Sequence, residues 1–240
     1  MKLLAIVPAY NEEGAVGDVV REIRHEWPDG EIVVIDDGSG DATSQVAALA
    51  GARVVRLPFN LGIGGAVQTG YRIAWDEGFD VAVQIDGDGQ HRPDQLPKLI
   101  ARLTEGPENL VVGTRFVAEE ASGFRSSRSR RGGIKILSWL VSRIVGHRVT
   151  DTTSGFRAAD RLAIELFAAH YPHDYPEVEA IVMAARGGLQ VAEVPVSMRA
   201  RAAGESSITP LRSAYYMVKV LLAIGVLCIG RRPGREGAGA

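Results

Sequence analysis

The chain alternates short runs of apolar, mostly β-branched residues with longer stretches of helical periodicity. The runs predict five strands, at residues 3–7, 31–36, 53–57, 81–86 and 110–114. Strands that alternate with helices form mostly parallel sheets covered on both faces. Unbroken apolar runs, such as residues 32–35, suit strands that are buried on both sides. We therefore expect an α/β fold with a mostly parallel central sheet.

The pattern changes after the fifth run. Residues 118–133 are rich in Ser, Gly and Arg and predict a mobile basic loop. The remaining periodicity predicts a helix at 134–145, a turn at 151–157, helices at 161–169 and 177–186, a strand at 190–196, a loop at 199–207 and an apolar helix at 211–229. No internal repeat is found. We expect a main domain over 1–208, a terminal helix over 209–230 that lies against a membrane or packs, and a disordered tail over 231–240.

The composition narrows the class of protein. With 240 residues, 46% of them hydrophobic, the chain can bury one sizeable core. The 27 basic and 29 acidic residues nearly cancel, so the whole protein has no electrostatic reason to coat nucleic acid or an anionic bilayer. The single cysteine, Cys228, excludes an intramolecular disulfide and fits a reduced, cytoplasmic setting.

Two apolar stretches are candidates for a signal peptide or a transmembrane helix. The first apolar run is too short for a signal peptide and is expected to be a buried strand. The stretch 217–229 contains Lys219 and falls short of the roughly 20 residues that span a bilayer. We therefore expect no transmembrane helix.

Polar loops follow four of the predicted strands, at residues 8–13, 36–39, 60–65 and 86–91. In open α/β sheets, ligands bind beyond the carboxyl ends of the strands. The four loops are therefore expected to converge on one edge of the sheet.

Asp86 and Asp88 occupy alternate positions just after a predicted strand, and Gly87 and Gly89 allow the chain to turn there. Two carboxylates suit Mg²⁺ or Mn²⁺, with water and substrate phosphates as further ligands. The alternative is a polar turn without a metal. An EF-hand is excluded, because Pro97 stands where the closing Glu should be.

The sequence Asp36-Asp37-Gly38-Ser39 also ends a predicted strand. Its carboxylates can accept hydrogen bonds from a base or a ribose. The alternative is a turn before a helix, capped by Ser39, Asp41 or Thr43.

A glycine cluster, at Gly62, Gly64, Gly65 and Gly70, matches neither phosphate-loop template. No Gly-Lys-Ser/Thr follows, and Val67 stands where the dinucleotide spacing needs Gly. Tight packing at a helix start is the expected role.

Basic residues after the fifth strand are candidates for phosphate binding. Arg115 ends that strand, and Arg128, Arg130 and Arg131 follow in the predicted loop. Arginine binds phosphate with a rigid donor fork, although a solvated basic loop is the alternative. His91 is next to the aspartates, but neither it nor the other histidines is assigned a role.

Taken in order, these loops resemble the family 2 glycosyltransferases, in particular the dolichyl-phosphate mannose synthase group with its bacterial polyprenyl-phosphate relatives. The resemblance extends nearly to residue 208, and the matching stretches are 8–13, 36–43, 60–66, 86–91, 113–115, 151–157 and 193–196. Each stretch is a weak signal alone, whereas the ordered set is specific.

The resemblance implies a GT-A fold, a Rossmann-like fold that binds nucleotide sugars. It implies that Asp86, Asp88 and Gln90 hold the metal and that Arg115 meets phosphate. The residues implied to surround the nucleotide are Pro8, Tyr10, Glu12, Ile35, Asp37, Asp86 and Gly87. The acceptor phosphate is implied to meet Arg115 and one of the arginines 128, 130 and 131.

In one late loop the chain departs from the mannose synthases, which carry an Arg and then a Lys that touch the donor. Arg201 matches the Arg, but Ser207 stands at the Lys position. The donor site therefore lacks one cation, which leaves nucleotide sugars other than GDP-mannose open.

The resulting hypothesis is an inverting, metal-dependent hexosyltransferase of the EC 2.4 class that acts on a polyprenyl phosphate, with Asp88, Arg115 and Arg201 as its catalytic residues. It predicts a nucleotide-sugar donor, a peripheral membrane location at the inner face of the cell membrane, and no nucleic-acid partner. The alternatives are a family 2 enzyme with a soluble or hydroxyl acceptor, a nucleotidyltransferase and a non-catalytic sugar-nucleotide-binding subunit. A nucleotidyltransferase would need a glycine-rich pyrophosphate loop near the N-terminus, which is absent.

Overall fold

A computed structural model of the chain describes residues 1–114, 128–146, 148–199 and 210–229. Its centre is a seven-stranded sheet with the order β3-β2-β1-β4-β6-β5-β7. The strands are β1 (Leu3–Ala9), β2 (Glu31–Asp36), β3 (Arg53–Arg56), β4 (Val81–Gln84), β5 (Leu110–Thr114), β6 (Arg157–Asp160) and β7 (Val191–Pro195). Every pairing is parallel except those that β6 makes with β4 and β5. The predicted α/β fold with a mostly parallel sheet is confirmed.

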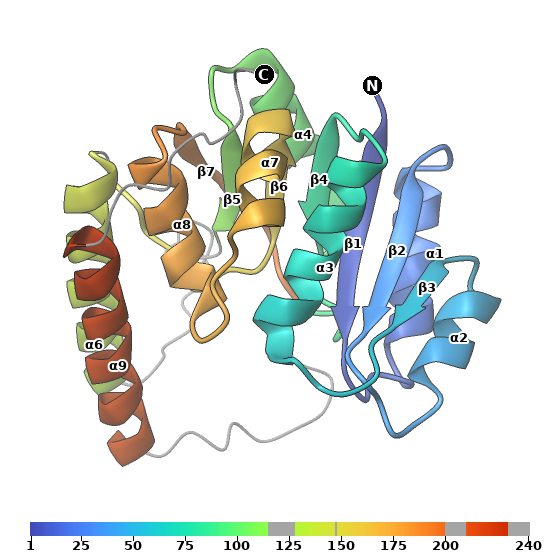
Figure 1. The fold of residues 1–240 in the computed structure, drawn as a ribbon, viewed down its shortest axis with the longest axis horizontal. Helices are drawn as coiled ribbons and strands as arrows, with labels where there is room; N and C mark the ends of the chain where they lie inside the picture. The colour runs from blue at the N-terminus through green and yellow to red at the C-terminus, as the bar shows by residue number, and fades with distance from the viewer. Residues whose placement is uncertain (115–127, 147, 200–209, 230–240) are drawn as a thin grey trace.

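Helices cover both faces of this sheet (Figure 1). One face packs against α1 (Val16–Glu26), α2 (Thr43–Leu49) and α4 (Leu96–Glu105), which follows the short 3₁₀ helix η1 (Pro93–Gln95). The other face packs against α3 (Gly62–Asp76), α7 (Arg161–Ala169) and α8 (Pro176–Arg186). Helices α6 (Arg128–Val145) and α9 (Pro210–Ile229) extend the same layer and pack against α8. Strands in such a sheet are buried on both sides, which explains their continuous apolar sequences.

Strand β6 was not expected from the sequence, which predicted only a turn up to residue 157. The strand reads Arg-Ala-Ala-Asp and has neither β-branched residues nor apolar alternation. Because β6 is antiparallel to its neighbours, its first residue lies near their carboxyl ends, where Arg157 is paired with Gln84 and Val112. The segment before Arg157 therefore lies at the same edge as the polar loops.

The basic region after β5 also differs from the prediction. Residues 128–133, expected in a mobile loop, form the first turns of α6, so the helix begins six residues earlier than predicted. Arginine has a high helix propensity, and the loop prediction rested on the Ser and Gly residues between the arginines. Arg128, Arg130 and Arg131 therefore lie on a helix.

Gly64 and Gly70 have the packing role that was expected of the glycine cluster, whereas Gly62 has open space around it and a φ of 82°. A Cβ on Gly70 of α3 would lie 2.2 Å from Ile6 of β1, and one on Gly64 would lie 2.4 Å from the Pro172 carbonyl oxygen. Only glycine allows α3 to approach the sheet and the segment between α7 and α8 this closely.

Helices α6 and α9 lie side by side at one end of the sheet (Figure 1). Large apolar side chains on these two helices face solvent: Trp139 is 64% exposed, Leu222 64% and Val226 71%. Among the described residues, no helix combines the length and the apolarity needed to cross a bilayer.

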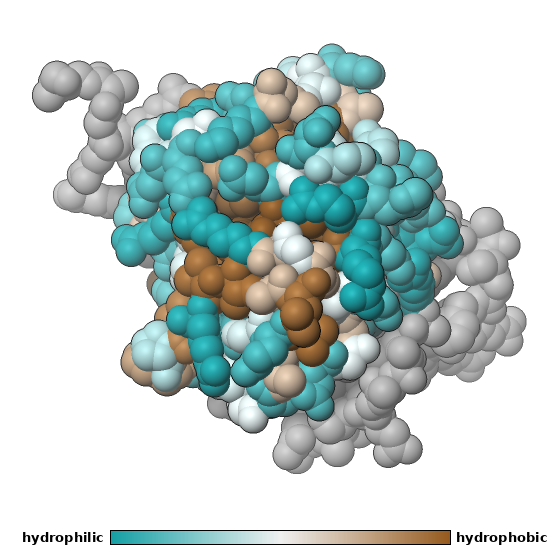
Figure 2. Space-filling view, turned by 90° about the vertical axis from the view of Figure 1, so that its right-hand side faces the viewer, coloured by the Kyte–Doolittle hydropathy of each residue, from teal (hydrophilic) through white to brown (hydrophobic). Residues whose placement is uncertain are grey.

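The opposite end of the sheet carries β3 and α2 and is shown face-on in Figure 2. Hydrophilic residues dominate this face, and smaller hydrophobic patches lie between them. The edge strand β3 begins and ends with exposed arginines, Arg53 and Arg56. Charged residues on an edge strand discourage pairing with another chain.

Candidate active site

The carboxyl ends of β1, β2 and β4 lie next to one another and bring three of the polar loops together. The backbone N–H of Asp37 donates to the Ala9 carbonyl over 2.9 Å, and that of Gly87 donates to the Pro8 carbonyl over 3.1 Å. Pro8, Asp37 and Gly87, which the sequence placed around one nucleotide, therefore lie on adjacent strands of one edge.

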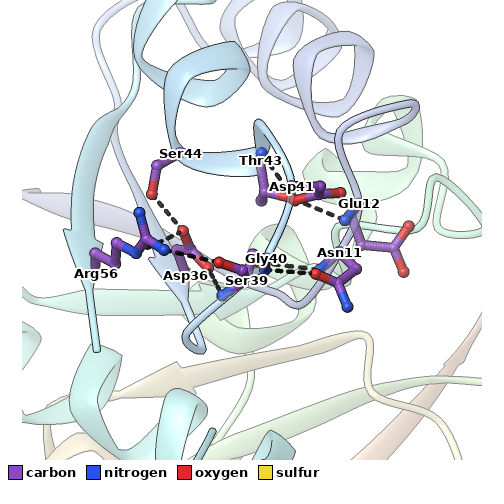
Figure 3. Close-up of polar contacts among 9 residues, drawn as sticks. All are labelled: Asn11, Glu12, Asp36, Ser39, Gly40, Asp41, Thr43, Ser44 and Arg56. Carbon is purple, nitrogen blue, oxygen red and sulfur yellow. Dashed lines mark hydrogen bonds and ion pairs between the residues drawn. The ribbon is translucent and has the colours of Figure 1, made fainter. Parts of the chain in front are cut away.

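The loop after β1 is tied to the loop after β2 by reciprocal hydrogen bonds (Figure 3). The Asn11 N–H donates to Ser39 Oγ, and the Gly40 N–H donates to Asn11 Oδ1, each over 2.9 Å. The Glu12 N–H donates to Thr43 Oγ1 over 2.8 Å. Asn11 has a φ of 55°, in the left-handed region that Asn tolerates better than most residues. We call the edge of the sheet formed by the carboxyl ends of β1, β2 and β4, with the loops that follow them, the rim. The contacts above hold Tyr10, whose side chain is 49% exposed, at this rim.

Asp36 is fully buried and organises the second loop from below (Figure 3). Its carboxylate accepts from the Ser39 N–H over 2.8 Å and from the Ser44 hydroxyl, and Arg56 Nε lies 3.8 Å away. Burial raises the pKa of Asp36, but the hydrogen bonds from Ser39 and Ser44 outweigh that effect and leave it below its ordinary value. Asp36 is therefore a charged structural group.

Asp37 bridges from β2 to the start of α3. Its two carboxylate oxygens accept from the Leu61 N–H over 2.7 Å and from the Gly62 N–H over 2.9 Å. Burial raises the pKa of Asp37, with a smaller contribution from the charge of Asp36, and the hydrogen bonds from Leu61 and Gly62 only partly offset this. The sequence offered Ser39, Asp41 or Thr43 as the cap of the helix that directly follows, but Ala42 occupies the N-cap position of α2. Asp37 instead accepts hydrogen bonds from the start of the next helix, α3.

Asp86 and Asp88 follow β4 at the centre of the rim. The side chain of Asp86 is 33% exposed, and Oδ1 accepts from the Gln84 amide over 3.3 Å. Asp88 accepts from the backbone N–H of Gln90 over 3.0 Å and from its side-chain amide. Gly89 has a φ of 74°, so the predicted need for glycine in this turn is confirmed at that position.

His91 and Gly155 surround Asp86 and had no role in the sequence interpretation. The Asp86 N–H donates to His91 Nδ1 over 3.0 Å, and His91 Nε2 lies 3.7 Å from Asp86 Oδ2. The His91 ring is buried and stacks on Phe156, with 5.1 Å between ring centroids. Gly155 lies at the rim because it precedes β6, and the antiparallel direction of β6 places its start at this edge of the sheet. Only the tertiary pairing of β6 with β4 brings it to Asp86, so local sequence carried no signal for this contact.

The residues present fit a divalent cation. Two carboxylates and one amide oxygen are hard ligands of the kind that Mg²⁺ and Mn²⁺ prefer. Within the described ranges no three His, Cys, Asp or Glu side chains form a metal-binding group. A cation at Asp86 and Asp88 would therefore share its ligand set with substrate phosphates and water, as Mg²⁺ sites commonly do.

A second polar cluster lies beneath the rim, where Arg157 is only 1% exposed. Its Nε donates to the Ser154 carbonyl over 2.9 Å, and its terminal nitrogens donate to the carbonyls of Pro176 and Glu177. Burial raises the pKa of Glu177, although the charge of Arg157 opposes this. Arg157 thus joins β6 to the start of α8.

The segment before β6 is held by Glu193 of β7. Glu193 accepts from the backbone N–H groups of Thr150 and Asp151, both over 2.8 Å. Asp151 is fully buried, and its Oδ1 accepts from the Thr153 N–H over 3.1 Å. These contacts fix the course of the chain towards Gly155.

The structure describes the remaining predicted site residues to different extents. Ile35 is fully buried in β2, directly before Asp36. Arg115 and Arg201 lie outside the described residues, as do Ser207 and the predicted tail from Arg231. For the arginines at 128, 130 and 131, only the helical backbone is described.

Comparison with known proteins identifies the family. The family described as "Glycosyl transferase family 2" matches residues 4–166. The undecaprenyl-phosphate mannosyltransferase of Micrococcus luteus is 34% identical over 222 residues, which cover 87% of this chain and 88% of that protein. The UDP-N-acetylglucosamine–dolichyl-phosphate N-acetylglucosaminyltransferase of Methanococcus voltae is 30% identical over 211 residues, which cover 80% of this chain and 83% of that protein.

A solved structure supports the same grouping. Glucosyl-3-phosphoglycerate synthase from Mycobacterium tuberculosis, in complex with Mn²⁺, uridine diphosphate and phosphoglyceric acid, superposes with a TM-score of 0.71 at 25% identity. The match covers 95% of this chain and 78% of that one. The chain belongs to the family 2 glycosyltransferases and has the GT-A fold. It is a glycosyltransferase of the EC 2.4 class, as the resemblance implied.

Proposed function

We propose that this protein transfers a hexose from a nucleotide-sugar donor to a polyprenyl phosphate, with inversion at the anomeric carbon and with the help of Mg²⁺ or Mn²⁺. The observation that carries the proposal is the similarity to transferases named for undecaprenyl and dolichyl phosphate, which extends over 80% or more of each chain. Similarity over this share of both chains supports the same class of acceptor.

The donor nucleotide is assigned to the loops after β1 and β2. Pro8, Tyr10 and Glu12 lie on the first loop, and Asp37 lies on the second. The hydrogen bonds between Asn11 and the pair Ser39 and Gly40 tie these two loops to each other. Preorganisation of this kind lowers the cost of ordering a binding site.

Asp86, Asp88 and Gln90 are assigned as the residues that hold the divalent cation against the donor diphosphate. The bound cation supplies positive charge where negative charge develops on the leaving nucleotide diphosphate. The structural relative with Mn²⁺ and uridine diphosphate supports this assignment. Arg201 is proposed to add a second positive charge at the same diphosphate.

The acceptor phosphate is assigned to Arg115 and one of Arg128, Arg130 and Arg131. A phosphate monoester has a second pKa of about 6, so near neutral pH its oxygen can attack without first losing a proton. Cations that position the phosphate are therefore more important than a general base. Three of the candidate arginines lie at the start of α6 rather than on the expected mobile arm.

We propose that the pair of helices α6 and α9 holds the enzyme against the membrane that contains its acceptor. Trp139, Leu222 and Val226 expose apolar side chains on these helices, and α9 leads towards Arg231 and Arg232. Exposed apolar groups with flanking basic residues are typical of peripheral helices. Such a location at the inner face of the cell membrane would bring the site to a lipid phosphate.

A soluble acceptor is the second candidate, and one specific observation favours it. The superposed Mycobacterium tuberculosis structure contains phosphoglyceric acid, a soluble phosphorylated acid. In that alternative, Arg115 and the basic start of α6 would bind the phosphate of a metabolite. Transfer assays with undecaprenyl phosphate in detergent and with a panel of phosphorylated metabolites would distinguish the two.

The donor can be identified independently of the acceptor. A thermal-shift panel of nucleoside diphosphates, each with and without Mn²⁺, should show one base that raises the melting temperature only when Mn²⁺ is present. No stabilisation by any nucleoside diphosphate would contradict the proposed donor site.

A further inference from the structure

The carboxylate of Asp86 is contacted from below by a buried chain of hydrogen bonds. Gln84 of β4 is 3% exposed, and its amide nitrogen donates to Asp86 Oδ1 over 3.3 Å. Tyr171, between α7 and α8, is 5% exposed, and its hydroxyl donates to Gln84 Oε1 over 3.4 Å. These hydrogen bonds therefore connect Tyr171, beneath the sheet, to Asp86 at the rim.

The chemistry of the three groups allows only one direction for this chain. An ionised carboxylate only accepts hydrogen bonds, so the nitrogen end of the Gln84 amide must face Asp86. The oxygen end then faces Tyr171, whose hydroxyl has to donate. The orientation of Gln84 is thus fixed from both ends.

Gln84 is also an unusual residue for a buried position, because its side chain is polar. Gln84 is paired with the buried Arg157 of β6, and the core on this face of the sheet is otherwise apolar and aromatic, with residues such as Ala82 and Tyr71. Burying an amide costs free energy unless its hydrogen bonds are made, and an apolar residue of similar size would avoid that cost. The amide is therefore expected to serve the group to which it donates, namely Asp86.

Asp86 is constrained on its other sides as well. His91 Nε2 lies 3.7 Å from Oδ2, and Gly155 leaves just enough space for both oxygens. A carboxylate that is one-third exposed would otherwise rotate freely about its terminal bond. Gln84 is the group that contacts Oδ1 and that fixes which oxygen is turned towards the rim.

We propose that Gln84, held by Tyr171, is a positioning residue that orients the Asp86 carboxylate to receive the divalent cation. The inference rests on the proposed function, because that function is what assigns a cation to Asp86. Hydrogen-bond partners of metal ligands commonly change metal affinity by about 10–100-fold when they are removed.

The test is a titration of the purified protein with Mn²⁺ alone, in which electron paramagnetic resonance measures free Mn²⁺. Gln84→Met keeps the size of the side chain but removes the amide, and we expect it to weaken Mn²⁺ binding about 10-fold. Tyr171→Phe keeps the ring and removes only the hydroxyl, and we expect a smaller loss of about 3-fold. Gln68→Met makes the same substitution in α3, where the amide donates to the Ala168 carbonyl, and should bind Mn²⁺ like the wild type.

Asp88→Ala separates this inference from the function on which it rests. If Asp88→Ala loses Mn²⁺ binding while folded Gln84→Met and Tyr171→Phe bind like the wild type, the positioning role is wrong and the metal assignment stands. If the wild type itself does not bind Mn²⁺, the metal assignment and the inference fail together. Thermal unfolding without metal shows whether Gln84→Met is folded. If Gln84→Met does not fold, Tyr171→Phe alone decides, and an unchanged Mn²⁺ affinity in that variant overturns the proposal.

Discussion

Gly155 lies against the carboxylate of Asp86 so closely that a Cβ on residue 155 would be 2.9 Å from both carboxylate oxygens. Gly155 is not among the glycines with a positive φ, so the reason for glycine here is space rather than backbone conformation. The two residues are 69 positions apart in the sequence and meet only because β6 pairs with β4.

Gly155→Ala should therefore impair the metal site with little effect on the fold. The methyl group would push the Asp86 carboxylate away from its position, and we expect Mn²⁺ affinity to fall by about 10-fold or more. Isothermal titration with Mn²⁺ and a nucleoside diphosphate measures this. Gly225→Ala, on a helix with open space around it, is the matched control. Equal affinity in both variants would show that Asp86 adapts or does not bind the metal.

Asp88→Ala should nearly abolish transfer while leaving the protein folded. A carboxylate at the rim supports a cation rather than the core, and a catalytic metal contributes several kcal/mol to the transition state, which corresponds to a loss of at least about 100-fold. Initial rates over a range of Mn²⁺ concentrations measure the effect. Asp94→Ala removes an exposed carboxylate that pairs with Arg92 and should leave the rate unchanged. Wild-type metal dependence in Asp88→Ala would refute the metal assignment.

Amide substitutions of three carboxyl groups, Asp151 before β6 and Glu177 and Glu179 in the first turn of α8, test whether the acceptor is a phosphate. Asp151→Asn, Glu177→Gln and Glu179→Gln should each lower the rate much less than the roughly 10²–10⁴-fold that follows loss of a general base. The reason is that a phosphate dianion does not need deprotonation. Single-turnover rates at saturating donor isolate the chemical step. A loss of the larger size, with donor and metal binding intact, would indicate a hydroxyl acceptor.

The surface of α6 and α9 should bind lipid. Leu222→Ser together with Val226→Ser should reduce sedimentation with anionic liposomes at low salt, because both side chains are largely exposed and apolar. Leu49→Ser removes a side chain that is 89% exposed on α2, at the other end of the sheet, and should have no effect. A wild-type protein that ignores liposomes, with lipid-acceptor activity unaffected by the double substitution, would contradict a peripheral location.

Asp36 and Asp37 should affect acid stability in opposite directions. The pKa of Asp36 is lowered on folding, so its contribution to stability is present above about pH 3.9 and is lost as the pH falls through its folded pKa. The pKa of Asp37 is raised, so its contribution is present at low pH and is lost as the pH rises through its folded pKa. Between about pH 6 and about pH 3, Asp36→Asn should flatten the acid loss of unfolding free energy, and Asp37→Asn should steepen it. Urea unfolding of both variants and of the wild type measures these slopes, and a change of slope in the same direction in both variants would contradict the assignment.

Much of the sheet could be predicted because its buried parallel strands have continuous apolar sequences. The strands at 31–36 and 110–114 were predicted with the observed bounds, and the clustering of loops at one edge followed from their parallel direction. Strand β6 could not be predicted, since Ala158 and Ala159 carry no strand signal and Arg157 is buried only through tertiary contacts.

The residues of the candidate site also fall into two groups, those that could be proposed from the sequence and those that could not. Its rim residues could be proposed from sequence, because carboxylates and glycines that occur together after buried strands are typical of ligand-binding loops in α/β sheets. The supporting contacts could not be predicted. Gln84 lies within a strand, Tyr171 is distant in sequence, and His91 owes its position to a turn whose geometry depends on Gly89.

The insertion of an antiparallel strand between β4 and β5 also constrains the order in which the protein can fold. When synthesis has reached Thr114, β1 to β5 exist, but β5 cannot join β4, because each of them pairs with β6, which lies between them. Non-local pairings of this kind form late, because closing a long loop precedes any gain from the contacts. The sides of β4 and β5 that β6 covers therefore stay unpaired until residue 160 is free of the ribosome, which makes this interval the one in which a chaperone would matter most.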